Sequence, residues 1–260
     1  MANTIETRRA RVAYATFLRD PEKLHSDWYR FYRTLRLLER LAPGEVGTGT
    51  RWFDIGCHSG AFLRALVECY GVDASGCDVY QAADKEERKY ECYQLTDNSR
   101  WSYRQIDVAC EPDWGGTFDV ISALEVIEHI IDTDQFLDRV RGHLVDGGLF
   151  VLTTPNINNL RNRLFVPIGR YPVTLEYRNI IHHVRLYNIR ALRDHFAAHG
   201  FSVLGIRGVQ MLPQRWLIRS APLRWWSELM ANAMPQLATN VIVIARKGPL
   251  PPAPAVGPVL

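Results

Sequence analysis

The stretch Trp52–Leu66, WFDIGCHSGAFLRAL, decides the fold of this chain. It begins with a short apolar run that ends in Gly56, and it continues with apolar residues at helical spacing. This pattern predicts a buried strand, a glycine turn and a helix, which together form the first unit of an open parallel sheet. At such a turn the helix N-terminus offers free N–H groups and a positive dipole end. Gly56 and Gly60 allow a ligand to approach the backbone closely.

Short apolar runs alternate with helical patterns along most of the chain, which is typical of repeated strand–helix units in an α/β protein. Residues 5–41 are predicted to be helical, and further helices are expected near residues 61–69, 134–144 and 188–200. The predicted strands cover residues 51–56, 74–79, 103–108, 118–124, 148–155, 201–208 and 239–247.

These patterns divide the chain into an N-terminal helical cap over residues 1–45, one domain over residues 46–247 and a proline-rich tail over residues 248–260. Two segments of the domain, 156–187 and 209–238, interrupt the strand–helix alternation and are expected to be lids over the carboxyl ends of the strands. The tail is expected to be disordered.

Composition indicates a globular protein in a reducing compartment. The 260 residues carry a net charge of only +3, which gives no strong signal for nucleic acid. The chain shows neither an apolar run long enough to span a membrane nor a secretory leader, and its five cysteines form no C-x-x-C pair. We therefore expect a cytoplasmic protein with reduced thiols.

Three aspartates at predicted strand ends describe a cleft shaped for adenosine. Asp78 follows Gly56 at the distance typical of an acid that binds ribose hydroxyls, and Asp107 closes the third strand, where it can receive the adenine amino group. The turn reads G-C-H-S-G and lacks the G-x-G-x-x-G of dinucleotide sites. Asp54, just before the turn, would repel a pyrophosphate but suits a cationic ammonium group. These features favour S-adenosylmethionine over NAD.

The chain resembles the class I S-adenosylmethionine-dependent methyltransferases in FDIGCHSG, SGCDVY, YRQIDV, TFDVISALEVIEHI and DGGLFVLTTPN. The resemblance implies a Rossmann-like α/β fold, with a seven-stranded, mostly parallel sheet whose last strand is antiparallel and with helices on both faces. His58 stands where the family usually has glycine, and it is strained if that position needs a positive φ. The cofactor-binding residues implied are Asp54, Gly56, Cys57, Gly60, Asp78, Asp107, Val108 and Leu124.

The stretch SALEVIEHIID places two carboxylates and an imidazole within five residues, a donor set that suits a hard cation. The E-x-x-E-H motif resembles the small-RNA 2′-O-methyltransferases and the ubiquinone-type O-methyltransferases. That resemblance implies a divalent metal (Mg, Mn or Zn) on Glu125, Glu128, His129 and His183. His182 or His183 is expected to act as a general base, and Glu125 to position the acceptor. E-x-x-E-H segments also occur without a metal, and there Glu128 would cap a helix.

The predicted function is methyl transfer to a hydroxyl oxygen of a small molecule or glycan, in a secondary-metabolite or polysaccharide pathway. Arginine and aromatic residues in the first lid suit a sugar or a phosphorylated acceptor, and they are Arg161, Arg163, Arg170, Tyr171, Tyr177 and Arg178. The second lid carries Trp216, Trp225 and Trp226 and is expected to pack on the core, with membrane contact as the alternative. Alternatives for the function are RNA 2′-O-methylation, C- or N-methylation, and non-catalytic cofactor binding.

Overall fold

The computed structural model describes residues 26–58, 60–79, 101–170, 172, 183–212, 216–217 and 220–251. Part of the predicted N-terminal helix, residues 5–25, lies outside these ranges, as does the tail from residue 252 onward. Helix α2 spans Ser26–Leu41, so the helical prediction is confirmed for the described part of that segment.

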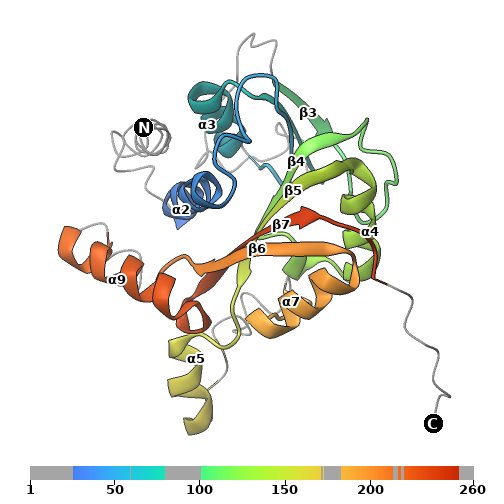
Figure 1. Cartoon of the computed structure of the whole chain (residues 1–260). Coiled ribbons are helices and arrows are strands. Elements are labelled where there is room, and N and C mark those ends of the chain that lie inside the picture. Colours follow the sequence, from blue (N-terminus) through green and yellow to red (C-terminus); the bar gives the residue numbers. More distant parts are fainter. Residues whose placement is uncertain are drawn as a thin grey trace, which may run out of the picture.

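Seven strands form one sheet in the order β3-β2-β1-β4-β5-β7-β6. Figure 1 shows β4, β5, β7 and β6 side by side in this order. Strands β1 to β5 pair in parallel, whereas β7 runs antiparallel to β5 and to β6. The Rossmann-like sheet implied by the resemblance is thereby confirmed. The strands are β1 (Arg51–Ile55), β2 (Asp73–Asp78), β3 (Trp101–Gln105), β4 (Phe118–Leu124), β5 (Leu144–Pro155), β6 (Phe201–Gly208) and β7 (Asn240–Lys247).

Helices cover both faces of the sheet, each over its own hydrophobic core. On one face, α2 and α3 (Ala61–Tyr70) pack on strand residues such as Trp52. On the other face, α4 (Thr133–His143) and α7 (Ile189–Ala198) pack on strand residues such as Phe53. Trp52 and Phe53 are neighbours in β1 and point to opposite faces because strand side chains alternate. This double burial explains why the strands read as continuous apolar runs.

The third strand ends earlier than its sequence predicts. It was expected to run to Val108, but β3 ends at Gln105. Ile106 N–H still donates to the carbonyl of Asp78, and then a turn begins at Asp107. The Asp107 carboxylate accepts the N–H of Ala109 and its carbonyl accepts that of Cys110, so this residue caps a turn rather than closing the strand.

Both predicted insertions contain helices. Segment 156–187 contains α5 (Leu160–Phe165) and η3 (Val166–Ile168), and segment 209–238 contains α9 (Ala221–Ala233) and η5 (Pro235–Leu237). The side chain of Asn156 joins the two segments, because its amide donates to the carbonyls of Gln236 and Ala238. Their role as lids, and the division into cap, domain and tail, stay predictions.

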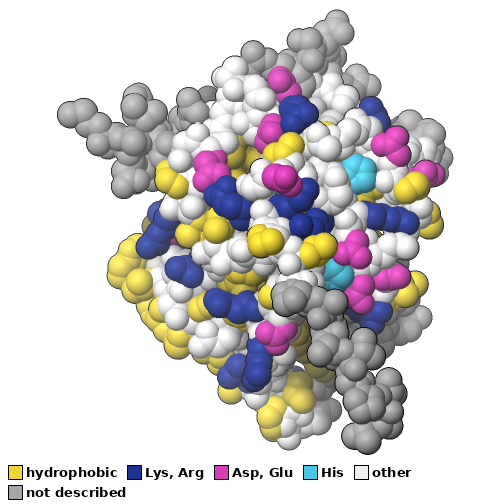
Figure 2. Space-filling model, turned by 45° about the vertical axis from the view of Figure 1, so that its right-hand side comes forward, with side chains coloured by type: hydrophobic (Ala, Val, Ile, Leu, Met, Phe, Trp, Pro, Cys, Tyr) yellow, Lys and Arg dark blue, Asp and Glu magenta, His cyan; other side chains and the backbone are white. Residues whose placement is uncertain are grey.

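The surface is of mixed charge. On the face shown in Figure 2, acidic and basic side chains are interspersed, in keeping with the small net charge of +3. Within the described ranges, none of the helices has both the length and the hydropathy to cross a bilayer.

The tight contact between β2 and α3 makes a testable prediction. A Cβ added at Gly76 would lie 2.5 Å from Leu63 Cδ1 and 2.9 Å from Cys57 Cβ, both of which are buried. We expect Gly76→Ala to lower the free energy of unfolding by about 1–3 kcal/mol because the core is overpacked. Denaturant unfolding monitored by circular dichroism measures this change.

Gly142→Ala is the matched control, because a Cβ at Gly142 in α4 meets nothing within 4 Å. This substitution should raise the free energy of unfolding by about 0.5–1 kcal/mol, since alanine loses less backbone entropy in a helix. Equal effects of the two substitutions would contradict the packing described for Gly76.

Candidate active site

The turn after β1 has the left-handed backbone that its glycines suggested. Gly56 and Gly60 have φ values of 68° and 74°, and a Cβ at Gly56 would lie 2.7 Å from Val126 Cγ2. His58 also has a positive φ, 49°, in a region that costs a non-glycine residue about 1–2 kcal/mol. The strain predicted for His58 is therefore present, and its N–H donates to Asp78 Oδ2 at 3.0 Å.

Asp54 lies in β1 with its carboxylate buried between two strands. Ser122 of β4 donates to Asp54 Oδ1 at 2.5 Å, and the indole N–H of Trp52 donates to Ser122 Oγ at 2.7 Å. Burial, with a smaller contribution from the nearby Asp78, raises the pKa of Asp54 from 3.8 to about 7, against the opposing effects of the Ser122 hydrogen bond and Arg30. A cation beside Asp54 would favour the ionised carboxylate.

The remaining predicted cofactor residues lie along the same edge of the sheet. Asp78 is the last residue of β2 and Leu124 is the last residue of β4, and both strands run parallel to β1. Cys57 is buried in the turn after β1, and its N–H donates to the carbonyl of Cys77. Asp107 is exposed and Val108 is buried in the turn after β3. The structure thus brings Asp54, the glycine turn and Asp78 together, with Asp107 in the turn after the outermost strand.

Glu125 follows β4 in an unusual conformation. It is the second non-glycine residue with a positive φ, 61°, among the described residues, and its N–H donates to the carbonyl of Thr153 in β5. Strained backbone of this kind clusters at functional sites. Its Oε2 accepts the side-chain amide of Asn240 at 2.7 Å and lies 3.9 Å from a guanidinium nitrogen of Arg30. The Glu125 carboxylate is therefore held by β7 and α2.

Arg30 and Asn240 are site residues that sequence reasoning missed. Arg30 is separated from Glu125 by almost a hundred positions and Asn240 by 115, so only the fold brings them together. Arg30 belongs to the amphipathic helix α2, where it reads as one of many surface arginines. Its burial, at 14% side-chain exposure, is the signal, and only the structure reveals it.

Three of the four predicted metal ligands lie close together. Ligand atoms of Glu128, His129 and His183 lie within 4.8 Å of one another, and the two imidazole rings meet edge to face at 5.0 Å. Glu128 and His129 belong to η2 (Ile127–His129). His183 is held beside them because the N–H groups of Val184 and Arg185 donate to the carbonyl of Glu128. His182, Tyr171, Tyr177 and Arg178 lie outside the described residues.

The Glu128 carboxyl is almost fully buried, at 1% exposure. Thr154 donates to its Oε2 at 3.0 Å, whereas its buried Oε1 has no hydrogen-bond partner among the described residues. Burial raises the pKa of Glu128 well above its ordinary value, and the nearby Glu125 raises it further. A site with one carboxylate, two imidazoles and an unsatisfied buried oxygen fits a divalent cation.

Taken together, the sheet order, the antiparallel last strand and the acids at the ends of β1 and β2 define a class I S-adenosylmethionine-dependent methyltransferase. Residues 27–205 match the model of the family described as "Methyltransferase domain", which is well over half of the chain. The chain belongs to this family and is an S-adenosylmethionine-dependent methyltransferase.

Two sequence relatives and one solved structure are consistent with this class of enzyme. The "Ubiquinone biosynthesis O-methyltransferase" of Nitrobacter winogradskyi is 28% identical over 201 residues, which are 74% of this chain and 70% of that protein. The protein of the same name from a Bradyrhizobium species is 33% identical over 119 residues, 43% of this chain and 42% of that protein. An S-adenosylmethionine-dependent methyltransferase from Mesorhizobium loti has the same fold, with a TM-score of 0.57 at 17% identity over 82% of this chain and 96% of that one.

The raised pKa of Asp54 predicts how cofactor binding depends on pH. If the ammonium group of the cofactor binds beside Asp54, the carboxyl must lose its proton on binding below about pH 7. Affinity for S-adenosylhomocysteine should therefore rise from about pH 5.5 to about pH 7.5 and then level off. Calorimetric titration at several pH values measures it. Asp54→Asn should weaken binding and remove the pH dependence.

Asp73→Asn, at the exposed opposite end of β2, is the control and should keep the wild-type dependence of affinity on pH.

The proton on the Asp54 carboxyl also affects the stability of the protein, with a defined sign. Between pH 3.8 and about 7 the native protein holds it and the unfolded chain has lost it, so the Asp54 contribution to the free energy of unfolding falls as pH rises. For cofactor binding, a wild-type affinity that does not change with pH would contradict the role assigned to Asp54.

Proposed function

We propose that this enzyme transfers the methyl group of S-adenosylmethionine to a hydroxyl oxygen of a small molecule or glycan. The acceptor binds beside Glu128, His129 and His183, which hold a divalent cation. The observation that carries the proposal is the convergence of these three side chains within 4.8 Å, just after β4. The "Ubiquinone biosynthesis O-methyltransferase" relatives support oxygen as the methylated atom.

The acceptor hydroxyl must be activated before it can attack the methyl group. In the transfer the S–CH₃ bond of the cofactor breaks as the O–CH₃ bond forms, and the hydroxyl proton must go to a base. A neutral hydroxyl is a poor nucleophile because its pKa lies far above neutrality. A bound divalent cation lowers the pKa of a coordinated hydroxyl and orients it. His182, next to His183, is proposed as the base, and an imidazole suits that role near neutral pH.

The residues around the cluster support binding and orientation. We leave Glu125 out of the proposed ligand set because its Oε2 already accepts from Asn240 and lies near Arg30. Its fixed carboxylate is proposed to position the acceptor. Oε1 of Glu128, which has no hydrogen-bond partner in the described part of the chain, would gain one when a cation is bound, and this would offset the cost of burying that atom. Of the three side chains, Glu128 is buried whereas His129 is exposed, so an acceptor can reach the cluster from solvent.

Manganese binding tests the site. With S-adenosylhomocysteine present, electron paramagnetic resonance should detect one Mn²⁺ per wild-type chain. Glu128→Gln and His183→Ala should each weaken Mn²⁺ binding about tenfold or more. Glu125→Gln should bind Mn²⁺ like the wild type, because it lies outside the proposed ligand set. Glu128→Gln is expected to fold, since glutamine is a neutral isostere of a carboxyl whose pKa is already raised.

The acceptor class is tested by methyl transfer from labelled cofactor to catechols, aliphatic diols and sugars, followed by mass spectrometry of the products. We expect O-methylated products that require the metal. Absence of Mn²⁺ binding by the wild type would refute the cation. Transfer to amines or carbon acceptors but not to hydroxyls would refute O-methylation, while the Asp54 titrations test cofactor binding independently.

A further inference from the structure

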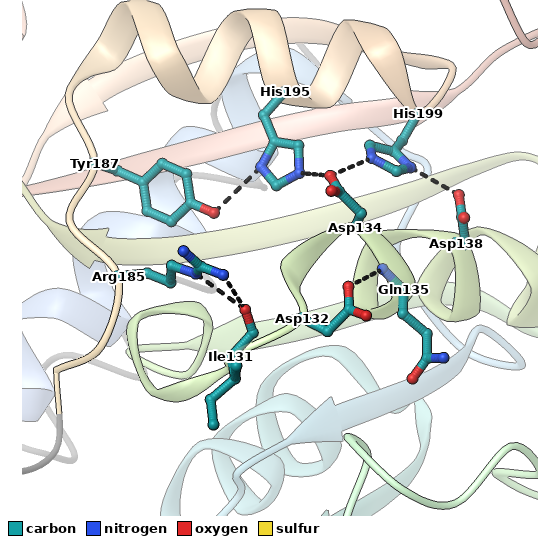
Figure 3. A network of polar contacts seen from close by, with 9 residues as sticks. All are labelled: Ile131, Asp132, Asp134, Gln135, Asp138, Arg185, Tyr187, His195 and His199. Atoms are coloured by element: carbon teal, nitrogen blue, oxygen red, sulfur yellow. Dashed lines mark hydrogen bonds and ion pairs between the residues drawn. The ribbon is translucent and has the colours of Figure 1, made fainter.

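A second cluster of histidine and aspartate lies between α4 and α7, built from none of the active-site residues above. Asp134 and Asp138 lie one turn apart on α4, and His195 and His199 lie one turn apart at the end of α7. Figure 3 shows both imidazoles turned toward Asp134. On the face in Figure 2, histidine side chains reach the surface beside acidic ones.

Both imidazoles present the same ring nitrogen to one carboxylate oxygen. His195 Nε2 lies 2.8 Å and His199 Nε2 lies 3.0 Å from Asp134 Oδ1. The other ring nitrogens are also held, since His195 Nδ1 lies 3.2 Å from the Tyr187 hydroxyl and His199 Nδ1 lies 2.7 Å from Asp138 Oδ1. Metal-binding histidines are oriented in this way, with one nitrogen on the metal and the other held by a carboxylate or a similar group.

A neutral His199 can donate a hydrogen bond to only one of its two carboxylate partners, Asp138 and Asp134. A neutral His199 that donates its Nδ1–H to Asp138 turns the lone pair of Nε2 toward the Asp134 carboxylate. Two acceptors at 3.0 Å repel each other unless a proton or a cation lies between them. Without a metal, a proton meets this requirement.

We propose that Asp134, His195 and His199 form a Zn²⁺ site that ties α7 to α4, with solvent completing the coordination. Their ligand atoms lie within 4.8 Å of one another. In a tetrahedral site with bonds of about 2.0–2.1 Å, ligand atoms are about 3.3 Å apart, so the two distances from Asp134 Oδ1 to the imidazole nitrogens need to widen by only a few tenths of an ångström. Histidines at positions i and i+4 of a helix are a common source of paired zinc ligands.

The burial of the three side chains suits an open site. His195 and His199 are 15% and 13% exposed, whereas Asp134 is 76% exposed. The imidazoles are thus fixed by packing, and the carboxylate leaves a path for an ion and for coordinating water.

Equilibrium dialysis of the full chain against Zn²⁺ tests the proposal. The measurements use a His183→Ala background, which removes one ligand of the proposed active-site cluster. We expect this variant to bind one Zn²⁺ per chain at the α4–α7 cluster. Adding Asp134→Asn or His199→Gln should weaken binding about tenfold or more, and adding Asp138→Asn should weaken it about tenfold. Zn²⁺ should raise the melting temperature only of those variants that bind it.

Asp132→Asn is the matched control, because it removes the same charge two residues away while asparagine can still cap α4 at Gln135. Its Zn²⁺ affinity should equal that of the background. If His199→Gln fails to fold, the Asp134→Asn result decides, since this exposed side chain tolerates the change. Absence of Zn²⁺ binding in the His183→Ala background, or unchanged affinity in Asp134→Asn, would overturn the proposal.

Discussion

The hydrogen-bond chain from Trp52 through Ser122 to Asp54 is the constraint around which the central sheet is organised. It joins β1 to β4, the two strands between which the chain reverses its direction of winding. Ligands bind at such switch points in open α/β sheets. All three residues are buried, so the Asp54 carboxylate is held by Ser122 and largely shielded from bulk water. The protein thus holds a group that is costly to ionise at the point where we propose that the ammonium group of the cofactor binds.

Among the described residues, Arg30 is the cation that faces the acidic groups around this point. Arg30 lies near Glu125 and also lowers the pKa values of Asp54 and Glu128 against the effect of their burial. It comes from α2, which precedes the sheet in the chain. The N-terminal helix is therefore part of the electrostatics of the site as well as of the core. Arg30 offsets only part of the effect of burial on Asp54 and Glu128, so a cationic group bound beside them would favour their ionised forms.

Sequence patterns predicted those strand boundaries that depend on neighbouring residues in the chain. The residues of β4 and β6 match their predicted ranges, because their apolar runs end at clear turn signals. The end of β3 was missed because the Asp107 side chain accepts a backbone N–H two residues later and stops the strand. Arg30 and Asn240 were missed because their roles arise from contacts across the chain. Likewise, His195 and Asp134 are 61 positions apart, and no local pattern joins them.

The packing of Cys57 against β2 has a chemical consequence. S-adenosylmethionine is an alkylating agent, and a thiolate beside it would compete with the acceptor for the methyl group. Burial raises the pKa of Cys77 to about 12 and that of Cys57 further still, with nearby aspartates adding to both. Both thiols therefore stay protonated and poorly nucleophilic. The same close packing that forbids a side chain at Gly76 protects the enzyme from methylating itself at the turn proposed to hold its cofactor.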